Sequence, residues 1–225
     1  MMGFGAFGKM PAVGDFFRLN APSGFVRAWD DWLQGTMIAV SEALGAGWDA
    51  HYMSAPIWRF SLAAGLAGPQ PVMGVLMPSV DRVGRRFPLT LMTPLPVTGA
   101  DELAHFSRET LFGAAETLAL EALEDDMTTD RLTTRLAELP APGSVAETLR
   151  DTGDGTLHLV ADEDTGVLPT LATRLLSSRY ARPSLWTAHV DGREHLIICE
   201  GLPSPRHARG FFDLSDPAVP SGAQA

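Results

Sequence analysis

Apolar residues recur at helical spacing in one long segment near the start of the chain. The segment follows Asn20 and Ser23, either of which suits a helix N-cap, and ends near Leu44. Its apolar positions are three and four residues apart: Phe25, Val26, Trp29, Trp32, Leu33, Met37 and Val40. This spacing predicts an amphipathic helix. Trp29 and Trp32 share one face of it, and we expect that face to be directed towards the core.

Short apolar runs bounded by Pro or Gly predict strands. The runs "PIWRFSLAAG", "PVMGVLMPSV" and "FPLTLMTPL" predict strands at 57–62, 72–77 and 88–92. The connections between them are too short for crossover helices, so neighbouring strands should be antiparallel. A short first strand is expected at 4–7, with residues 11–15 forming the turn that leaves it.

The second half of the chain mixes helical and strand patterns. Helical spacing is found in five segments: 101–127, 131–139, 145–149, 171–180 and 205–214. A strand is expected at 156–162, and "SLWTAHV" and "HLIICEG" flank Asp191-Gly192 as a hairpin would. Helices that follow runs of strands indicate an α/β protein, with helical layers stacked on a mixed or largely antiparallel sheet.

The domain organisation follows from length and from these patterns. We expect one α/β domain over residues 1–214, with possible lobes at 1–140 and 141–214, because 225 residues suit one large domain. The tail 215–225, "SDPAVPSGAQA", has the composition of a disordered segment. The sequence does not indicate an oligomeric state.

Charge and cysteine content exclude several classes of protein. The net charge is −10, with +1 in residues 1–100 and −11 in residues 101–225. An acidic second half repels a phosphate backbone, so we expect no nucleic-acid partner. No apolar run reaches the ~18 residues of a membrane-spanning helix, and we expect no membrane insertion. The single Cys199 lies in an apolar strand, so it should be packed rather than reactive, and it fits a reducing, cytoplasmic compartment.

The opening segment partly matches a nucleotide-binding loop. Gly3 to Lys9 has a glycine, four residues and then Gly-Lys. A phosphate-binding loop needs a hydroxyl after the lysine and a helix that begins there. Met10 takes the place of the hydroxyl, and Pro11 disfavours helical geometry in the residue before it. We therefore interpret this segment as a strand and a turn, and expect no nucleotide or other cofactor.

The densest polar cluster within apolar sequence is "MPSVDRVGRRFP", residues 77–88. It brings together Ser79, Asp81, Arg82, Arg85 and Arg86. Three arginines near one loop suit a carboxylate or a phosphate, which guanidinium groups bind by paired hydrogen bonds. Alternatively, Asp81 pairs with Arg82 or Arg85 and ties the loop to the fold. An isolated buried ion is costly, so we expect that pair in either case, with at least one other arginine directed outward.

Catalytic motifs are weak. No serine lies in a G-x-S-x-G elbow, and no histidine is near Ser79 and Asp81 in the sequence. A hydrolase or phosphate-handling enzyme that uses these two residues and the three arginines is kept as the alternative function. His189, Asp191 and His195 lie near one turn but lack a further ligand, so we expect no metal site.

Several blocks of the sequence resemble the TagF family, accessory proteins of bacterial type VI secretion. "GKMPAVGDFFRL" is similar to the family's opening GK-x-P-x-x-GDF. The blocks "WDDWLQ", "PIWRFSLAAG" and "GVLMPSVDRVGRRFPLTL" follow in the family's order, so that the resemblance spans residues 8–91. The later "SLWT" and "GLPSP" also resemble the family, although paired tryptophans are usual where this chain has Trp186-Thr187. Residues 100–180 match no motif of the family.

The resemblance implies a function that the residues alone do not. TagF-like proteins are cytoplasmic regulators that repress assembly or firing of the secretion machine after translation, and they are linked with its forkhead-associated scaffold protein. The implied fold is α/β with helices on both faces of a central sheet. No catalytic residues are established for the family, so the resemblance implies a non-enzymatic protein. The motif residues that are candidates for interaction are Lys9, Asp15, Arg59, Ser79, Asp81, Arg82, Arg85 and Arg86.

The placement of these motif residues separates the two functions. If Asp15, Arg59, Asp81 and Arg85 bond mainly to one another and to the backbone, the motif is a scaffold. If they line an open pocket in which Ser79 is exposed, the arrangement favours an enzyme.

Overall fold

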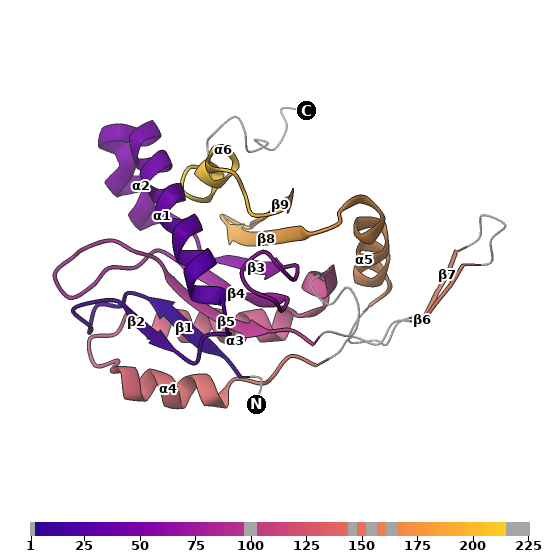
Figure 1. The fold of residues 1–225 in the computed structure, drawn as a ribbon, viewed down its shortest axis with the longest axis horizontal. Helices are drawn as coiled ribbons and strands as arrows, with labels where there is room; N and C mark the ends of the chain where they lie inside the picture. Colours follow the sequence, from indigo (N-terminus) through magenta and orange to yellow (C-terminus); the bar gives the residue numbers. More distant parts are fainter. Residues whose placement is uncertain (1–2, 97–102, 144–147, 152–156, 161–165, 215–225) are drawn as a thin grey trace.

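A seven-stranded antiparallel sheet forms the centre of the molecule (Figure 1). The computed structural model describes residues 3–96, 103–143, 148–151, 157–160 and 166–214. The strand order is β2-β1-β5-β4-β3-β8-β9, and each neighbouring pair is antiparallel. The strands are β1 (Gly5–Gly8), β2 (Phe17–Leu19), β3 (Trp58–Leu62), β4 (Val72–Met77), β5 (Leu89–Pro94), β8 (Pro183–Val190) and β9 (Arg193–Glu200). The expected largely antiparallel sheet is confirmed.

Helices cover both faces of this sheet, as the resemblance implied (Figure 1). On one face lie α1 (Phe25–Leu44), α2 (Trp48–Ser54) and α6 (Pro205–Ala208). On the other lie α3 (Glu109–Glu121) and α4 (Thr129–Glu138). Each face has its own apolar core, because side chains alternate between the two faces of a strand. The molecule is therefore a three-layer α/β/α sandwich.

The remaining elements lie beside this sandwich. Helix α5 (Val167–Arg179) packs on the short 3₁₀ helix η2 (Leu103–Ser107), where the Thr173 hydroxyl donates to the Leu103 carbonyl at 3.0 Å. Strands β6 (Thr148–Asp151) and β7 (Leu157–Val160) form a separate two-stranded sheet that extends away from the main body (Figure 1). Among the described residues, no helix is long and apolar enough to cross a membrane.

Two helix predictions were wrong in part. The helix expected at 101–127 is broken at Arg108, whose φ of −117° separates η2 from α3. Residues 101–102 lie outside the described residues. The short helix expected at 145–149 is also contradicted, because Thr148 and Leu149 begin strand β6, while 145–147 are outside the described part. The expected tail 215–225 likewise lies outside it.

The start of α1 also differs from expectation. Neither Asn20 nor Ser23 caps the helix: the N-cap is Gly24, with φ of 78°, and no side chain caps it. A left-handed φ suits glycine, which has no Cβ to clash. The end of the helix at Leu44 is confirmed. The helix α2 that follows it was not predicted.

The two tryptophans of α1 fix this helix on the sheet. Trp29 is fully buried, and its indole N–H donates to the Thr90 hydroxyl on β5 at 2.9 Å. Its ring stacks on Trp186 of β8, with the centroids 6.0 Å apart. Trp32 is only half-buried and donates to the Pro203 carbonyl at 2.9 Å. The expected core-facing stripe is therefore confirmed for Trp29, while Trp32 lies at the edge of the core.

We predict that Trp29→Ala lowers the free energy of unfolding by about 3–5 kcal/mol, because it leaves a cavity and an unpaired Thr90 hydroxyl. Thermal melting followed by circular dichroism measures the loss. Leu168→Ala is the control, because Leu168 is 77% exposed on α5 and its removal should leave the melting temperature nearly unchanged. Equal melting temperatures for wild type and Trp29→Ala would contradict the placement of Trp29 in the core.

Candidate functional site

Two loops meet at one edge of the sheet, where strands β1 and β4 end and strand β5 begins. One loop, residues 9–16, joins β1 to β2, and the other, residues 78–88, joins β4 to β5. Because β5 pairs with both β1 and β4, the loops emerge side by side. A backbone hydrogen bond joins them, with the Arg82 N–H donating to the Val13 carbonyl at 3.0 Å. The sequence cluster 77–88 thus lies against the "GKMPAVGDFF" block.

The carboxylate of Asp81 is the centre of this junction. It is buried, and its Oδ2 accepts from Lys9 Nζ at 3.0 Å and from Arg85 Nε at 2.6 Å. Its Oδ1 accepts from the backbone N–H groups of Val83 at 3.0 Å and Arg85 at 2.9 Å. The expected pairing with Arg85 is confirmed, and Lys9 is a second partner that the sequence did not predict. Both oxygens of Asp81 are therefore satisfied inside the protein.

These bonds keep Asp81 ionised. Burial by itself raises the pKa of the carboxyl group, since it disfavours the charged form. The hydrogen bonds from the Arg85 backbone, from Lys9, from the Arg85 side chain and from Val83 together outweigh burial and hold the pKa well below its usual range. An ionised carboxylate with every lone pair committed is a structural anchor and not a general acid.

The hydroxyl, N–H and carbonyl groups of Ser79 are also hydrogen-bonded within the protein. Its side chain is buried, and its Oγ donates to the Lys9 carbonyl at 2.8 Å. The Tyr52 hydroxyl donates to the Ser79 carbonyl at 2.7 Å and accepts from the Ser79 N–H at 3.0 Å. Burial raises the pKa of Tyr52 above its ordinary value, so that this group stays neutral. Ser79 has neither the exposure nor the adjacent base of a nucleophile, which removes the support for the alternative hydrolase.

Arg59 and Arg86 tie helices to the sheet. Arg59 of β3 makes a bidentate pair with Glu116 of α3, at 2.7 and 2.8 Å, and a further bond of 2.5 Å to Glu109. The hydrogen bond with Glu116, followed by the one with Glu109, raises the pKa of Arg59 despite its burial. Arg86 pairs with Asp49 of α2 at 2.8 Å. Arg86 is therefore not the outward-directed arginine of the cluster.

Besides Asp15, four side chains at the junction are exposed. We call Phe16, Arg82, Val83 and Arg85 the two-loop surface. Phe16 is 47% and Val83 70% exposed, and the Arg85 side chain is 58% exposed. The Arg82 side chain is exposed, and among the described residues its guanidinium has no hydrogen bond or ion pair. Sequence reasoning singled out the arginines but missed Phe16 and Val83, because exposure of an apolar side chain has no local signature.

Asp15 contributes less to this junction than its place in the motif suggested. Its Oδ1 accepts from the Phe16 N–H at 2.8 Å, which fixes the turn before β2. Its side chain is exposed, and no described cation pairs with it. Asp81, Arg85 and Asp15 thus bond to one another and to the backbone, as expected of a scaffold, whereas Arg59 bonds to Glu109 and Glu116 outside the motif.

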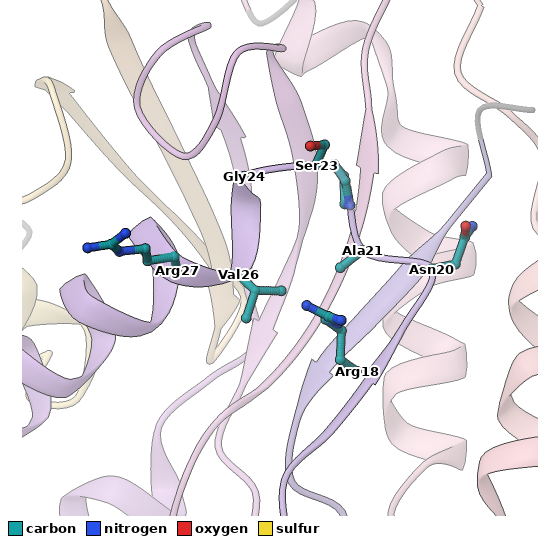
Figure 2. Close-up of a pocket in the computed structure, with 8 residues that line it drawn as sticks. Arg18, Asn20, Ala21, Ser23, Gly24, Val26 and Arg27 are labelled. Atoms are coloured by element: carbon teal, nitrogen blue, oxygen red, sulfur yellow. The ribbon is translucent and has the colours of Figure 1, made fainter.

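A shallow pocket of about 580 Å³ lies beside the start of α1 (Figure 2). Its lining includes Arg18, Asn20 and Val26. Figure 2 shows the Arg18 guanidinium near Val26, while Arg27 points away from the other lining side chains. No acidic residue lines this pocket. The lining holds one hydroxyl, that of Ser23, but no general base to activate it, so the pocket suggests no reaction.

The β8–β9 hairpin does not form a metal site. Asp191 and Gly192 form its two-residue turn, with φ of 50° and 74°, as predicted. His195 pairs with Ala188, so His189, the next residue along β8, points to the opposite face of the sheet. Within the described ranges, no cluster of three or more His, Cys, Asp or Glu side chains suits a metal ion. Cys199 is partly buried, and burial raises the pKa of its thiol.

A second polar network lies inside the fold. His105 of η2 is buried, with Nδ1 at 2.8 Å from the Ser61 hydroxyl and Nε2 at 2.9 Å from the Thr187 hydroxyl. Burial, and then the nearby charges of Arg59 and Arg108, lower the pKa of His105 to about 3. This neutral imidazole joins strands β3 and β8 to η2. Ser61 is itself buried, so the serine and histidine pair is closed to a substrate.

We predict that Asp81→Ala lowers the melting temperature by roughly 5–10 °C, because Lys9 stays buried without its counter-charge. The matched control is Asp126→Ala. Asp126 is also bonded to an arginine, Arg131, but its side chain is 74% exposed, and exposed pairs contribute little. If the two variants melt at the same temperature, Asp81 is not the anchor of the two loops.

We also predict that His105 makes the protein less stable as the pH falls below about 6.5. Its folded pKa of about 3 lies below the ordinary 6.5, so between these values the unfolded chain binds a proton that the folded chain does not. The free energy of unfolding then falls by up to about 1.4 kcal/mol per pH unit from this group. Urea melts of wild type and His105→Gln at pH 7, 6 and 5 measure the difference in slope. Parallel curves for the two proteins would rule out this contribution.

Comparisons with known proteins identify the family of the chain. Residues 5–139 match the family described as "TagF N-terminal domain, Type VI secretion system-associated". The solved crystal structure of PA0076 from Pseudomonas aeruginosa PAO1 is 31% identical in sequence, with a TM-score of 0.78, and the match covers 99% of each chain. No curated protein matches this chain. The family match covers more than half of the sequence, and the chain belongs to the TagF family of type VI secretion-associated proteins.

Proposed function

We propose that this protein is a cytoplasmic, non-enzymatic regulator that represses assembly or firing of the type VI secretion machine after translation. Membership of the TagF family supports the link to secretion. One structural observation favours binding over catalysis. The buried polar residues at the centre of the motif are occupied with one another, with Asp81 bonded to Lys9 and Arg85 and Ser79 bonded to the Lys9 carbonyl.

The proposed partner is the forkhead-associated scaffold protein of the machine, which the family resemblance implies. In this proposal the motif residues have two kinds of role. Lys9, Ser79 and Asp81 hold the two loops in one conformation, and Arg59 and Arg86 tie helices to the sheet. Asp15 fixes the turn, while Arg82 and Arg85 border the surface that meets the partner.

We expect the purified protein to bind the purified scaffold from the same bacterium, and expect extra copies of its gene to reduce secretion without reducing the amount of machine proteins. Size-exclusion chromatography and calorimetry measure the complex, and immunoblots of culture supernatant and cells measure secretion and protein levels. The variant Asp126→Ala changes an exposed carboxylate between α3 and α4, away from the two loops, and should repress secretion as the wild type does. Failure of the wild-type protein to bind the scaffold, or a fall in the machine proteins themselves, would refute the proposal.

A further inference from the structure

We infer that the two-loop surface, Phe16, Arg82, Val83 and Arg85, binds an acidic segment of a partner protein. The inference rests on the proposed function, in that it takes the protein to act by binding, and it adds the place of contact and the chemistry of the bound segment.

Positive charge exceeds negative charge at this surface. Lys9 and Arg85 share the single buried carboxylate of Asp81. The Arg82 guanidinium has no partner among the described residues. The nearby Asp15 is exposed and accepts from a backbone N–H. Apart from the Arg86–Asp49 pair, the two loops hold three positive charges, on Lys9, Arg82 and Arg85, against two negative charges, on Asp81 and Asp15, and so keep one positive charge that their own carboxylates do not neutralise.

The two exposed guanidinium groups converge on Gly14. Arg85 Nη2 donates to the Gly14 carbonyl at 2.7 Å. Arg82 Nη2 lies 3.0 Å from the point where a Cβ of residue 14 would be, so the absence of a side chain at Gly14 makes room for it. Arg82 keeps its guanidinium N–H donors unpaired among the described residues, and Arg85 keeps those that are not bound to Asp81 and Gly14. Neighbouring guanidinium donors suit the paired oxygens of carboxylates or phosphates.

Apolar side chains flank this charge. Phe16 packs edge-on against Phe87 with ring centroids 4.7 Å apart, and the Lys9 ammonium lies 4.7 Å from the centre of the Phe16 ring. The Phe16 ring is thus held in place, although nearly half of the residue is exposed. Val83 is exposed at the tip of the other loop. Rigid aromatic and arginine side chains are typical of residues that dominate binding energy, because little conformational freedom is lost on contact.

The rest of the molecule favours an acidic occupant at this position. The whole chain carries a net charge of −10, and residues 101–225 alone carry −11. An acidic segment is therefore repelled by most of the protein and attracted to the cationic two-loop surface. Such complementarity determines where and how fast a partner docks more than it raises the final affinity. The backbone bond between Arg82 and Val13, together with the side-chain bonds of Lys9, Ser79 and Arg85 between the loops, keeps the surface formed before the partner arrives.

Fluorescence anisotropy with three labelled peptides tests the inference. One peptide contains Glu, Asp and Leu, the second has Lys in place of every acidic residue, and the third has phosphoserine in place of half of the acidic residues. We expect the first and third to bind, more weakly as salt is raised, and the Lys peptide not to bind. The stronger of the first and third shows whether carboxylate or phosphate is preferred.

Variants place the binding on the two-loop surface. Arg82→Ala should weaken the binding of the two acidic peptides about tenfold, as expected for the loss of hydrogen bonds to a charged group. Val83→Ser should weaken the same peptides through lost contact with their Leu residues. Both residues are exposed, so the melting temperatures should not change. The control is Arg131→Ala on α4, an arginine that is 44% exposed but paired with Asp126. Equal binding of the Lys peptide, unchanged binding by Arg82→Ala, or equal loss in Arg131→Ala would overturn the inference.

Two further measurements separate this inference from other occupants and from the proposed function. If light scattering at low salt shows a dimer that Arg82→Ala abolishes, the occupant is a second copy of this chain and the inference is wrong. If the scaffold binds wild type and Arg82→Ala equally, the two-loop surface is not the contact, while the proposed function remains. If the scaffold does not bind wild type at all, the proposed function fails whatever the peptides do.

Discussion

The buried carboxylate of Asp81 is the interaction on which the candidate surface depends. Four hydrogen bonds reach it, from one lysine, one arginine and two backbone N–H groups. A buried charge is tolerated only when it is paired and hydrogen-bonded. Asp81 meets this condition by recruiting groups from two loops that are far apart in the chain. The hydrogen bonds to this one carboxylate thereby fix the position of Lys9 relative to Arg85, and with it the position of one loop relative to the other.

The same constraint divides the arginines of the cluster into classes that their spacing does not reveal. Arg85 forms an ion pair with Asp81 but keeps part of its side chain exposed. Arg86 forms an ion pair with Asp49 of α2, whereas Arg82 is exposed beside Gly14. A cluster that looked uniform in sequence therefore contains one arginine that holds the two loops together, one that joins the loop to α2, and one, Arg82, whose guanidinium has no bonding partner in the part of the chain that the structure describes. Its anchor groups are occupied within the fold, and its exposed groups are suited to contact and not to chemistry.

Local patterns in the sequence predicted the elements that local physics determines. The helix that ends at Leu44, the three central strands and the Asp191-Gly192 turn each follow from spacing, breakers or turn residues within a few positions. The pairing of Asp81 with Arg85 could be predicted for the same reason, because the two residues are only four positions apart. In contrast, the bond from Lys9 to Asp81 spans 72 residues, and only the neighbouring positions of β1 and β5 explain it. The break at Arg108 was missed because His105 is held by Ser61 and Thr187, which lie on distant strands.

The residues of the two cores of the sandwich are complete at different times during synthesis. The core beneath α3 and α4 draws its residues from Phe4 to Leu139, whereas the core beneath α1 also needs Trp186 and Phe211. During synthesis the first core can close while strand β3 still lacks its partner β8 and Trp29 still lacks Trp186. Pairing over such separations is slow to form and leaves an apolar sheet edge uncovered meanwhile. The nascent chain is therefore most open to misassociation in the interval before β8 emerges, when one face of the sheet is folded and the other is not.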